Sequence, residues 1–227
     1  MRGSVIALLL VVLHLQASGV ARADDAADLA AITAAVPACD AARAHCFGLQ
    51  VHVVAGESGG FVVTPTWIAA QVATANKHFA PLGVGFQLAG VDGLPASAAH
   101  VETRADRNKL ASHLGGPVVH VFFIAKLEDV DEPGAPVYGV TWHVPKDDRK
   151  YIIVAGNAFE RTLAHELGHV FGLPHSEYAI SIMNKTKRDQ PPLDERRFAD
   201  EELAAMKPAV VDLVRRKVLA ERKPAAP

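Results

Sequence analysis

Apolar and polar residues follow two different periods along the chain, and the pattern predicts strands interleaved with helices. Apolar or alternating runs of strand length lie at residues 49–54, 84–91, 118–125, 137–144 and 151–154. The run at 118–125 is almost entirely apolar, which predicts a central strand covered on both faces. We expect His120, inside this run, to be a hydrogen-bonded core histidine rather than a ligand.

Helices are predicted between these strands and after them. Thr64 and Pro65 suit the N-cap and the first position of a helix. Its buried face is predicted to hold Ile68, Val72, Ala75 and Phe79. A short helix is expected near 104–114.

A final helix is expected to begin near Asp200, and Pro208 should kink or split it. Its apolar face is predicted to hold Leu203, Met206, Val210, Val214 and Val218. Strands alternating with helices, without internal repeats, favour one α/β domain.

Composition limits the classes of function. The chain has 227 residues, of which 50% are hydrophobic and 21% charged, as in an ordinary globular protein. The formal net charge of -2 leaves no electrostatic footprint for nucleic acid, so no nucleic-acid partner is expected. We expect a monomer.

The N-terminus has the pattern of a secretory signal peptide. Arg2 precedes an apolar run at 5–15, and small residues at Ala21 and Ala23 suit a signal peptidase. We therefore expect residues 1–23 to be removed by cleavage after Ala23. The alternative is a membrane anchor, for which the apolar run is too short to span a bilayer comfortably. The mature protein is then expected to be secreted or periplasmic, without membrane attachment. Residues 24–48 would be a lead-in or short propeptide, and 49–222 the folded domain.

Export would place the two cysteines, Cys39 and Cys46, in an oxidising compartment. In an oxidising compartment, two cysteines close in sequence favour a disulfide that closes a small loop. The alternative is that one thiolate caps a metal in a latent form, since thiolates bind metals.

One stretch carries candidate chemistry: "HELGHVFGLPH", from His165 to His175. A helix places residues four apart on one face, so His165 and His169 can converge on one ion. Gly172 permits a left-handed turn that ends the helix, which lets His175 supply a third ligand. Glu166 adjoins the first ligand without coordinating.

Three neutral histidines and a water form the open arrangement of one catalytic Zn²⁺ ion. Glu166 is then placed as the general base for that water. A bare HExxH can occur on any amphipathic helix, where the histidines are incidental. The longer pattern is far more demanding, since it fixes three ligands, a base and a glycine with a backbone role.

These residues resemble the signature of the metzincin zinc peptidases, and "SIMN" resembles their Met-turn, with Met183 as its methionine. The interval from His175 to Met183 is most similar to the matrixin branch. The resemblance implies an α/β (α+β) fold in a single domain. It also implies a five-stranded mixed, twisted sheet with an antiparallel edge strand, an active-site helix, a Met-turn and a C-terminal helix. Met183 would form a hydrophobic base beneath the zinc.

The resemblance also implies how substrate binds. Residues Gly139, Val140, Thr141 and Trp142 would lie on the edge strand, which pairs with a peptide or protein substrate in extended form. The loop at 184–192 would wall the pocket on the leaving-group side. Its cations Lys185, Lys187 and Arg188 either favour acidic side chains or form an ordinary solvated surface.

The extra metal sites of matrixins are not expected. Structural calcium is not supported, because Asp129, Asp131 and Glu132 are better explained as a solvated acidic loop. The sequence therefore predicts a secreted zinc endopeptidase. The alternatives are a zinc-binding, catalytically inactive homologue that binds peptides or proteins, and a structural domain with incidental histidines.

Overall fold

The computed structural model describes residues 23–143 and 149–223. A five-stranded sheet has the order β2-β1-β4-β7-β6. Its strands are β1 (His45–Val54), β2 (Val84–Leu94), β4 (Val119–Ile124), β6 (Gly139–His143) and β7 (Lys150–Ala155). Neighbouring strands are parallel except β6, which pairs antiparallel with β7 at the edge. The predicted mixed sheet with an antiparallel edge strand is confirmed.

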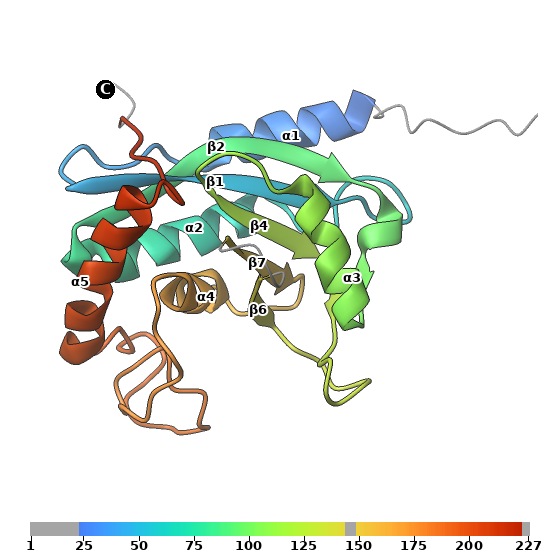
Figure 1. Ribbon diagram of the computed structural model, residues 1–227. Coiled ribbons are helices and arrows are strands. Elements are labelled where there is room, and N and C mark those ends of the chain that lie inside the picture. Colours follow the sequence, from blue (N-terminus) through green and yellow to red (C-terminus); the bar gives the residue numbers. More distant parts are fainter. Residues whose placement is uncertain (1–22, 144–148, 224–227) are drawn as a thin grey trace, which may run out of the picture.

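Helices surround this sheet (Figure 1). They are α1 (Ala23–Ala35), α2 (Pro65–Phe79), α3 (Arg104–Lys109), α4 (Thr162–Val170) and α5 (Asp200–Arg215). Short 3-10 turns lie at Ala80–Leu82, Ala96–Ala98 and Leu110–His113, so the helix expected near 104–114 is divided in two. Two short strands, β3 (His100–Val101) and β5 (Lys126–Leu127), pair with each other. Within the described residues, no helix is long and apolar enough to cross a membrane.

The local signals for α2 act as predicted. Thr64 Oγ1 accepts a hydrogen bond from the Trp67 backbone N–H at 3.2 Å, which caps the helix. Ile68, Val72, Ala75 and Phe79 are all fully buried. This face holds α2 against the sheet and against α4, which carries the histidine motif.

Strand β4 is covered on both faces, as its apolar sequence predicts. Val121 and Phe123 belong to the core beneath α2 and α4, whereas Phe122 and Ile124 belong to the core on the opposite face. His120 is 3% exposed, and its Nδ1 lies 3.0 Å from Nε2 of His52. The prediction of a hydrogen-bonded core histidine is confirmed.

The expected domain boundary at residue 49 needs correction. Strand β1 begins at His45, and α1 is part of the same core, since Ile32 is fully buried and Val36 is 7% exposed. Residues 24–48 lack a strong apolar periodicity, so the sequence did not predict that α1 and the start of β1 pack into the core. The predicted signal peptide, residues 1–23, lies outside the described residues except for Ala23.

The expectation for Pro208 was wrong in part, because α5 runs unbroken through it. Pro208 and Ala204, one turn earlier, are both exposed. Water can therefore satisfy the Ala204 carbonyl that the proline leaves without a donor. Met206 and Val210 are buried as predicted, but the helix ends before Val218.

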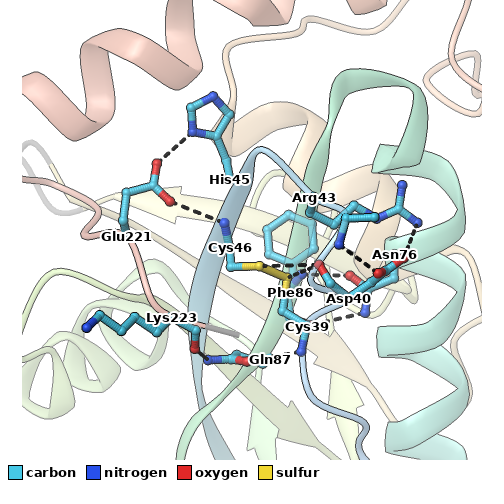
Figure 2. Close-up of a disulfide and its surroundings, with 11 residues drawn as sticks. Cys39, Asp40, Arg43, His45, Cys46, Asn76, Phe86, Gln87, Glu221 and Lys223 are labelled. Carbon is cyan, nitrogen blue, oxygen red and sulfur yellow. Dashed lines mark hydrogen bonds and ion pairs between the residues drawn. A yellow bond between two sulfur atoms is a disulfide. The ribbon is translucent and has the colours of Figure 1, made fainter. Parts of the chain in front are cut away.

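Cys39 and Cys46 form the predicted disulfide, with their Cα atoms 6.1 Å apart (Figure 2). The Cys46 backbone N–H also donates to Glu221 Oε2 at 3.2 Å, which ties the start of β1 to the C-terminal segment. Because both sulfurs are in the bond, the alternative of a metal-capping thiolate does not hold.

Candidate metal centre

Three histidines converge at the C-terminal end of α4. His165 and His169 lie one turn apart on the helix, and His175 follows it. One ring nitrogen from each can be chosen so that all lie within 4.8 Å of one another. The Nε2 atoms of His165 and His169 are 3.2 Å apart. The structure thus brings together the three residues that the sequence nominated as ligands.

The turn after α4 has a specific backbone cause. Gly172 has φ of 92°, a left-handed conformation that favours glycine. The Leu173 N–H donates to the Gly168 carbonyl at 2.9 Å, and the Gly172 N–H donates to the His169 carbonyl at 3.1 Å. This pair of bonds is the Schellman arrangement that ends a helix and reverses the chain. It carries His175 back toward the first two histidines.

Backbone carbonyls orient two of the rings. His165 Nδ1 donates to the Ile182 carbonyl at 2.8 Å, and His169 Nδ1 donates to the Leu173 carbonyl at 2.7 Å. A carbonyl only accepts, so each Nδ1 carries the hydrogen and each Nε2 keeps a lone pair for a metal.

Burial also keeps the rings neutral. It lowers the pKa of His165 to about 4, and it lowers the pKa values of His169 and His175. Neutral imidazole is the form that binds metal. Three such nitrogens fit the donor set of a catalytic zinc site.

Glu166 lies beside this group and is 4% exposed. Burial raises its pKa to about 7, while the Thr141 hydroxyl, 2.9 Å from Oε2, opposes that rise. A carboxylate with a pKa near neutrality is suited to accept and return a proton.

Strand β6 approaches Glu166 closely because of a glycine. A Cβ atom on Gly139 would lie 2.6 Å from Thr162 Cγ2 and 3.0 Å from Glu166 Oε1. Any larger residue would displace the carboxylate or the strand. The edge strand and the candidate base are therefore fitted to each other.

Met183 lies beneath the motif helix and is fully buried. Its sulfur touches α4 at Gly168, where an added Cβ would lie 2.6 Å from Sδ. The Met183 carbonyl accepts from the Ser176 N–H at 3.3 Å, next to His175. Met183 thus packs against the helix that carries the candidate ligands, as expected for a hydrophobic base.

The histidines and Glu166 line a cleft of about 1230 Å³. Strand β6 contributes Gly139, Val140 and Thr141 to it, and the segment after Met183 contributes Asn184 to Arg188. All four residues predicted for the edge strand, Gly139 to Trp142, lie on β6, although the Trp142 side chain does not line the cleft. Its Nε1 donates to Asn108 Oδ1 of α3 at 2.8 Å.

Several contributors to this site were not foreseen. The hydroxyl of Thr141 and the carbonyls of Ile182 and Leu173 act through contacts that no motif encodes. Arg161 also lines the cleft. Because it lies one helical turn before His165, its presence on the same side of the helix could have been predicted from the sequence.

Comparisons with known proteins point to the same class of protein. The family model described as Matrixin matches residues 116–205, which include the histidine motif, Met183 and strand β6. No curated protein matches the chain.

Two solved structures are similar. Metalloproteinase-II from Bacteroides fragilis has a TM-score of 0.52 and 12% identity, over 78% of this chain and 60% of that one. Archaemetzincin from Methanopyrus kandleri has a TM-score of 0.48 and 17% identity, over 72% of this chain and 96% of that one. The chain thus spans 60% of the length of the Bacteroides protein, and at this identity the likeness concerns the fold. Together, the motif, the fold and the matrixin match show that this chain resembles the metzincin zinc metallopeptidases.

Proposed function

We propose that this chain is an exported zinc endopeptidase with one catalytic Zn²⁺ ion. The observation that carries the proposal is the convergence of His165, His169 and His175 beside the buried carboxylate of Glu166. Incidental surface histidines have no need of carbonyl partners that orient two of the rings, nor of a buried carboxylate at their side.

The three histidines would hold the ion through their ring nitrogens. When bound there, Zn²⁺ lowers the pKa of water and polarises a carbonyl oxygen. Glu166 takes a proton from the attacking water and gives it to the leaving nitrogen of the scissile peptide bond. Thr141 holds the carboxylate in position through its hydroxyl.

An extended peptide would bind along β6. This strand is the last in the sheet order, so one of its edges is open to an added strand within the described part of the chain. Gly139 and Thr141 bring that edge next to Glu166. The loop at 184–192 would then enclose the leaving-group side of the peptide.

Export is proposed from two features. The first is the signal-peptide pattern of residues 1–23. The second is the Cys39–Cys46 disulfide, since such bonds form and persist in secreted and periplasmic proteins. Mass spectrometry of the protein from its native cells tests this, because an N-terminus before residue 24 in exported material contradicts cleavage after Ala23.

The activity is tested with the mature protein and a diverse peptide library. Wild type, chelator-treated wild type and Glu166→Ala are compared, and zinc content is measured for each. We expect turnover only in untreated wild type, with a loss of roughly 10²–10⁴-fold in Glu166→Ala. The variant should still hold zinc, because Glu166 is not a ligand.

The same experiment separates the alternatives. Zinc without turnover in wild type would favour a peptide- or protein-binding homologue. Glu166→Ala that cleaves as fast as wild type would contradict the proposed mechanism. Protein that holds no zinc, and whose folding ignores chelators, would leave the histidines without the proposed role.

A further inference from the structure

The cleft is strongly cationic on the side of the 184–196 segment. Its lining includes Lys150, Arg161, Lys185, Lys187, Arg188 and Arg196, against Asp129 and Glu166 as the acidic residues. Glu166 is engaged by Thr141. The chain as a whole carries a net charge of -2, so this concentration of cations is local. It creates a positive potential within the cleft, where low-dielectric walls strengthen it.

Two of the arginines build the wall of the cleft. Arg188 donates to the carbonyls of Ser181 at 2.6 Å and Ala179 at 2.7 Å. Arg196 is 8% exposed and donates to the carbonyls of Pro191 and Arg188, at 2.9 and 2.6 Å. These contacts fix the loop, but they are made to neutral carbonyls. Within the described residues, neither guanidinium pairs with a carboxylate, so both positive charges remain uncompensated.

Arg161 differs from Arg188 and Arg196 in its contacts. Its guanidinium lies 5.2 Å from the centre of the Phe159 ring, and within the described part of the chain it has no hydrogen-bond partner. The side chain is half-buried, and burial together with Arg196 and Arg188 lowers its pKa. A half-buried guanidinium next to two other uncompensated cations is an electrostatically unfavourable arrangement that a bound anion relieves.

The position of Arg161 relates it to the scissile bond. It directly precedes α4, four residues before His165, so it lies about one helical turn, or roughly 5.4 Å, along the helix from the first ligand. Residues of an extended peptide are about 3.3 Å apart. A substrate group held by Arg161 would therefore belong to a residue close to the bond that is cut.

On these grounds we infer that Arg161 is a specificity-determining residue that binds a carboxylate of the substrate on the leaving-group side of the scissile bond. A guanidinium presents paired donors that match the two oxygens of a carboxylate, which a neutral amide cannot reproduce. The inference rests on the proposed peptidase function, because it assigns the substrate class of that site. The carboxylate comes from an aspartate or glutamate side chain or from the C-terminus of a short peptide.

The test uses peptides that are acetylated and amidated and that carry Glu, Gln or Leu at each position flanking the cut. For wild type, replacing Glu by Gln at the preferred position should lower kcat/KM about 10-fold or more. Arg161→Met should erase this difference, and Arg161→Lys should keep part of it. Arg215→Met is the matched control, since it removes the same charge from an exposed site on α5.

A second arm compares each peptide with a free C-terminus and with an amide. If the free terminus alone produces the Arg161-dependent preference, the terminal carboxylate is the group that binds. If side-chain Glu produces it in amidated peptides, the side chain is that group. Equal cleavage of Glu and Gln peptides in both arms, unchanged in Arg161→Met, would overturn the inference while leaving the peptidase function intact.

Binding is also measured without turnover, by fluorescence anisotropy of labelled peptides on Glu166→Ala and on Glu166→Ala with Arg161→Met. We expect the Glu peptide to bind about 10-fold more tightly than the Gln peptide only where Arg161 is present. If the wild type cleaves no peptide and this binding difference persists, the endopeptidase proposal fails and the role of Arg161 stands. Equal affinities in both proteins would remove the role of Arg161 in binding.

Discussion

The Ser181 hydroxyl joins the Met-turn to the C-terminal helix: Ser181 Oγ lies 2.7 Å from each carboxylate oxygen of Glu202. Both residues are buried, with Ser181 fully so and Glu202 5% exposed. Ser181 Oγ also accepts the Met183 N–H at 2.8 Å, and the adjoining Ile182 carbonyl accepts from His165 Nδ1. A buried carboxylate on α5 is thus connected through the Met-turn to the ring of a candidate ligand.

Ser181→Ala tests this connection. Removing the hydroxyl leaves Glu202 short of a donor in a buried site, so we expect a loss of about 1–3 kcal/mol in the free energy of unfolding. Zinc affinity should fall by roughly 10-fold, since the carbonyl that orients His165 loses its support. Urea unfolding and a competitive zinc titration measure the two effects. Ser112→Ala, at an exposed hydroxyl, is the control. A Ser181 variant with the unfolding free energy and zinc affinity of wild type would show that the connection has no effect on the site.

Gly139→Ala tests the fit between the edge strand and Glu166. The added methyl group meets Thr162 and Glu166 at less than van der Waals distance, so the carboxylate or the strand must move. We expect kcat/KM to fall by on the order of 10²-fold, because catalysis depends on the position of the base. Gly115→Ala is the matched control, since nothing lies within 4 Å of its added methyl group. Equal losses in the two variants would point to a general effect of alanine and against the proposed fit.

The buried pair His52 and His120 predicts acid sensitivity on the opposite face of the sheet. Burial, with His120 as the next cause, lowers the pKa of His52 to about 4, whereas Asp92 opposes and His113 adds to the shift. The folded state therefore binds fewer protons than the unfolded state below the ordinary histidine pKa of 6.5. The stability contributed by His52 is complete above pH 6.5 and is lost as the pH falls from 6.5 toward 4.

His52→Gln should flatten this dependence by up to about 1.4 kcal/mol per pH unit. Urea unfolding between pH 7.5 and about 4 measures it, with chelator present so that metal binding does not contribute. His100→Gln, at an exposed histidine, should follow the wild-type curve. Parallel curves for His52→Gln and wild type would assign the acid sensitivity to other groups.

The disulfide is expected to stabilise the fold without serving the site. It closes a loop with a sequence separation of 7, for which chain entropy predicts a contribution of about 2–3 kcal/mol. Replacing both cysteines by alanine should lower Tm and leave zinc binding at 25 °C unchanged. Thermal unfolding of wild type with and without reductant is the companion measurement. Loss of zinc from the folded double variant would mean that the disulfide supports the metal site after all.

The residues that act through local geometry were predictable from the sequence. Thr64 and the four apolar positions predicted for the buried face of α2 follow rules of capping and periodicity that apply within one helix. The convergence of His165 with His169 depends only on the helical repeat, and Gly172 ends the helix because its backbone tolerates a positive φ. The near-continuous apolar run of β4 predicted a strand covered on both faces.

Other features depended on which elements meet in space. Trp142 lies on the edge strand as predicted, but the sequence did not show that its indole would contact Asn108 of α3 instead of the cleft. Likewise, nothing in residues 24–48 showed that α1 would pack into the core, or that Pro208 would lie on a solvated face of α5. The links from Glu202 through Ser181 toward His165, from Gly139 to Glu166, and among the three arginines join residues that lie far apart in the chain or on different elements. The sequence by itself determined which candidate ligands and which candidate base lie together, because the helical repeat of α4 and the turn at Gly172 set their geometry. Only the tertiary structure decided how the candidate base is buried, what orients the candidate ligands and which charges line the cleft, because those properties arise from contacts between separate elements.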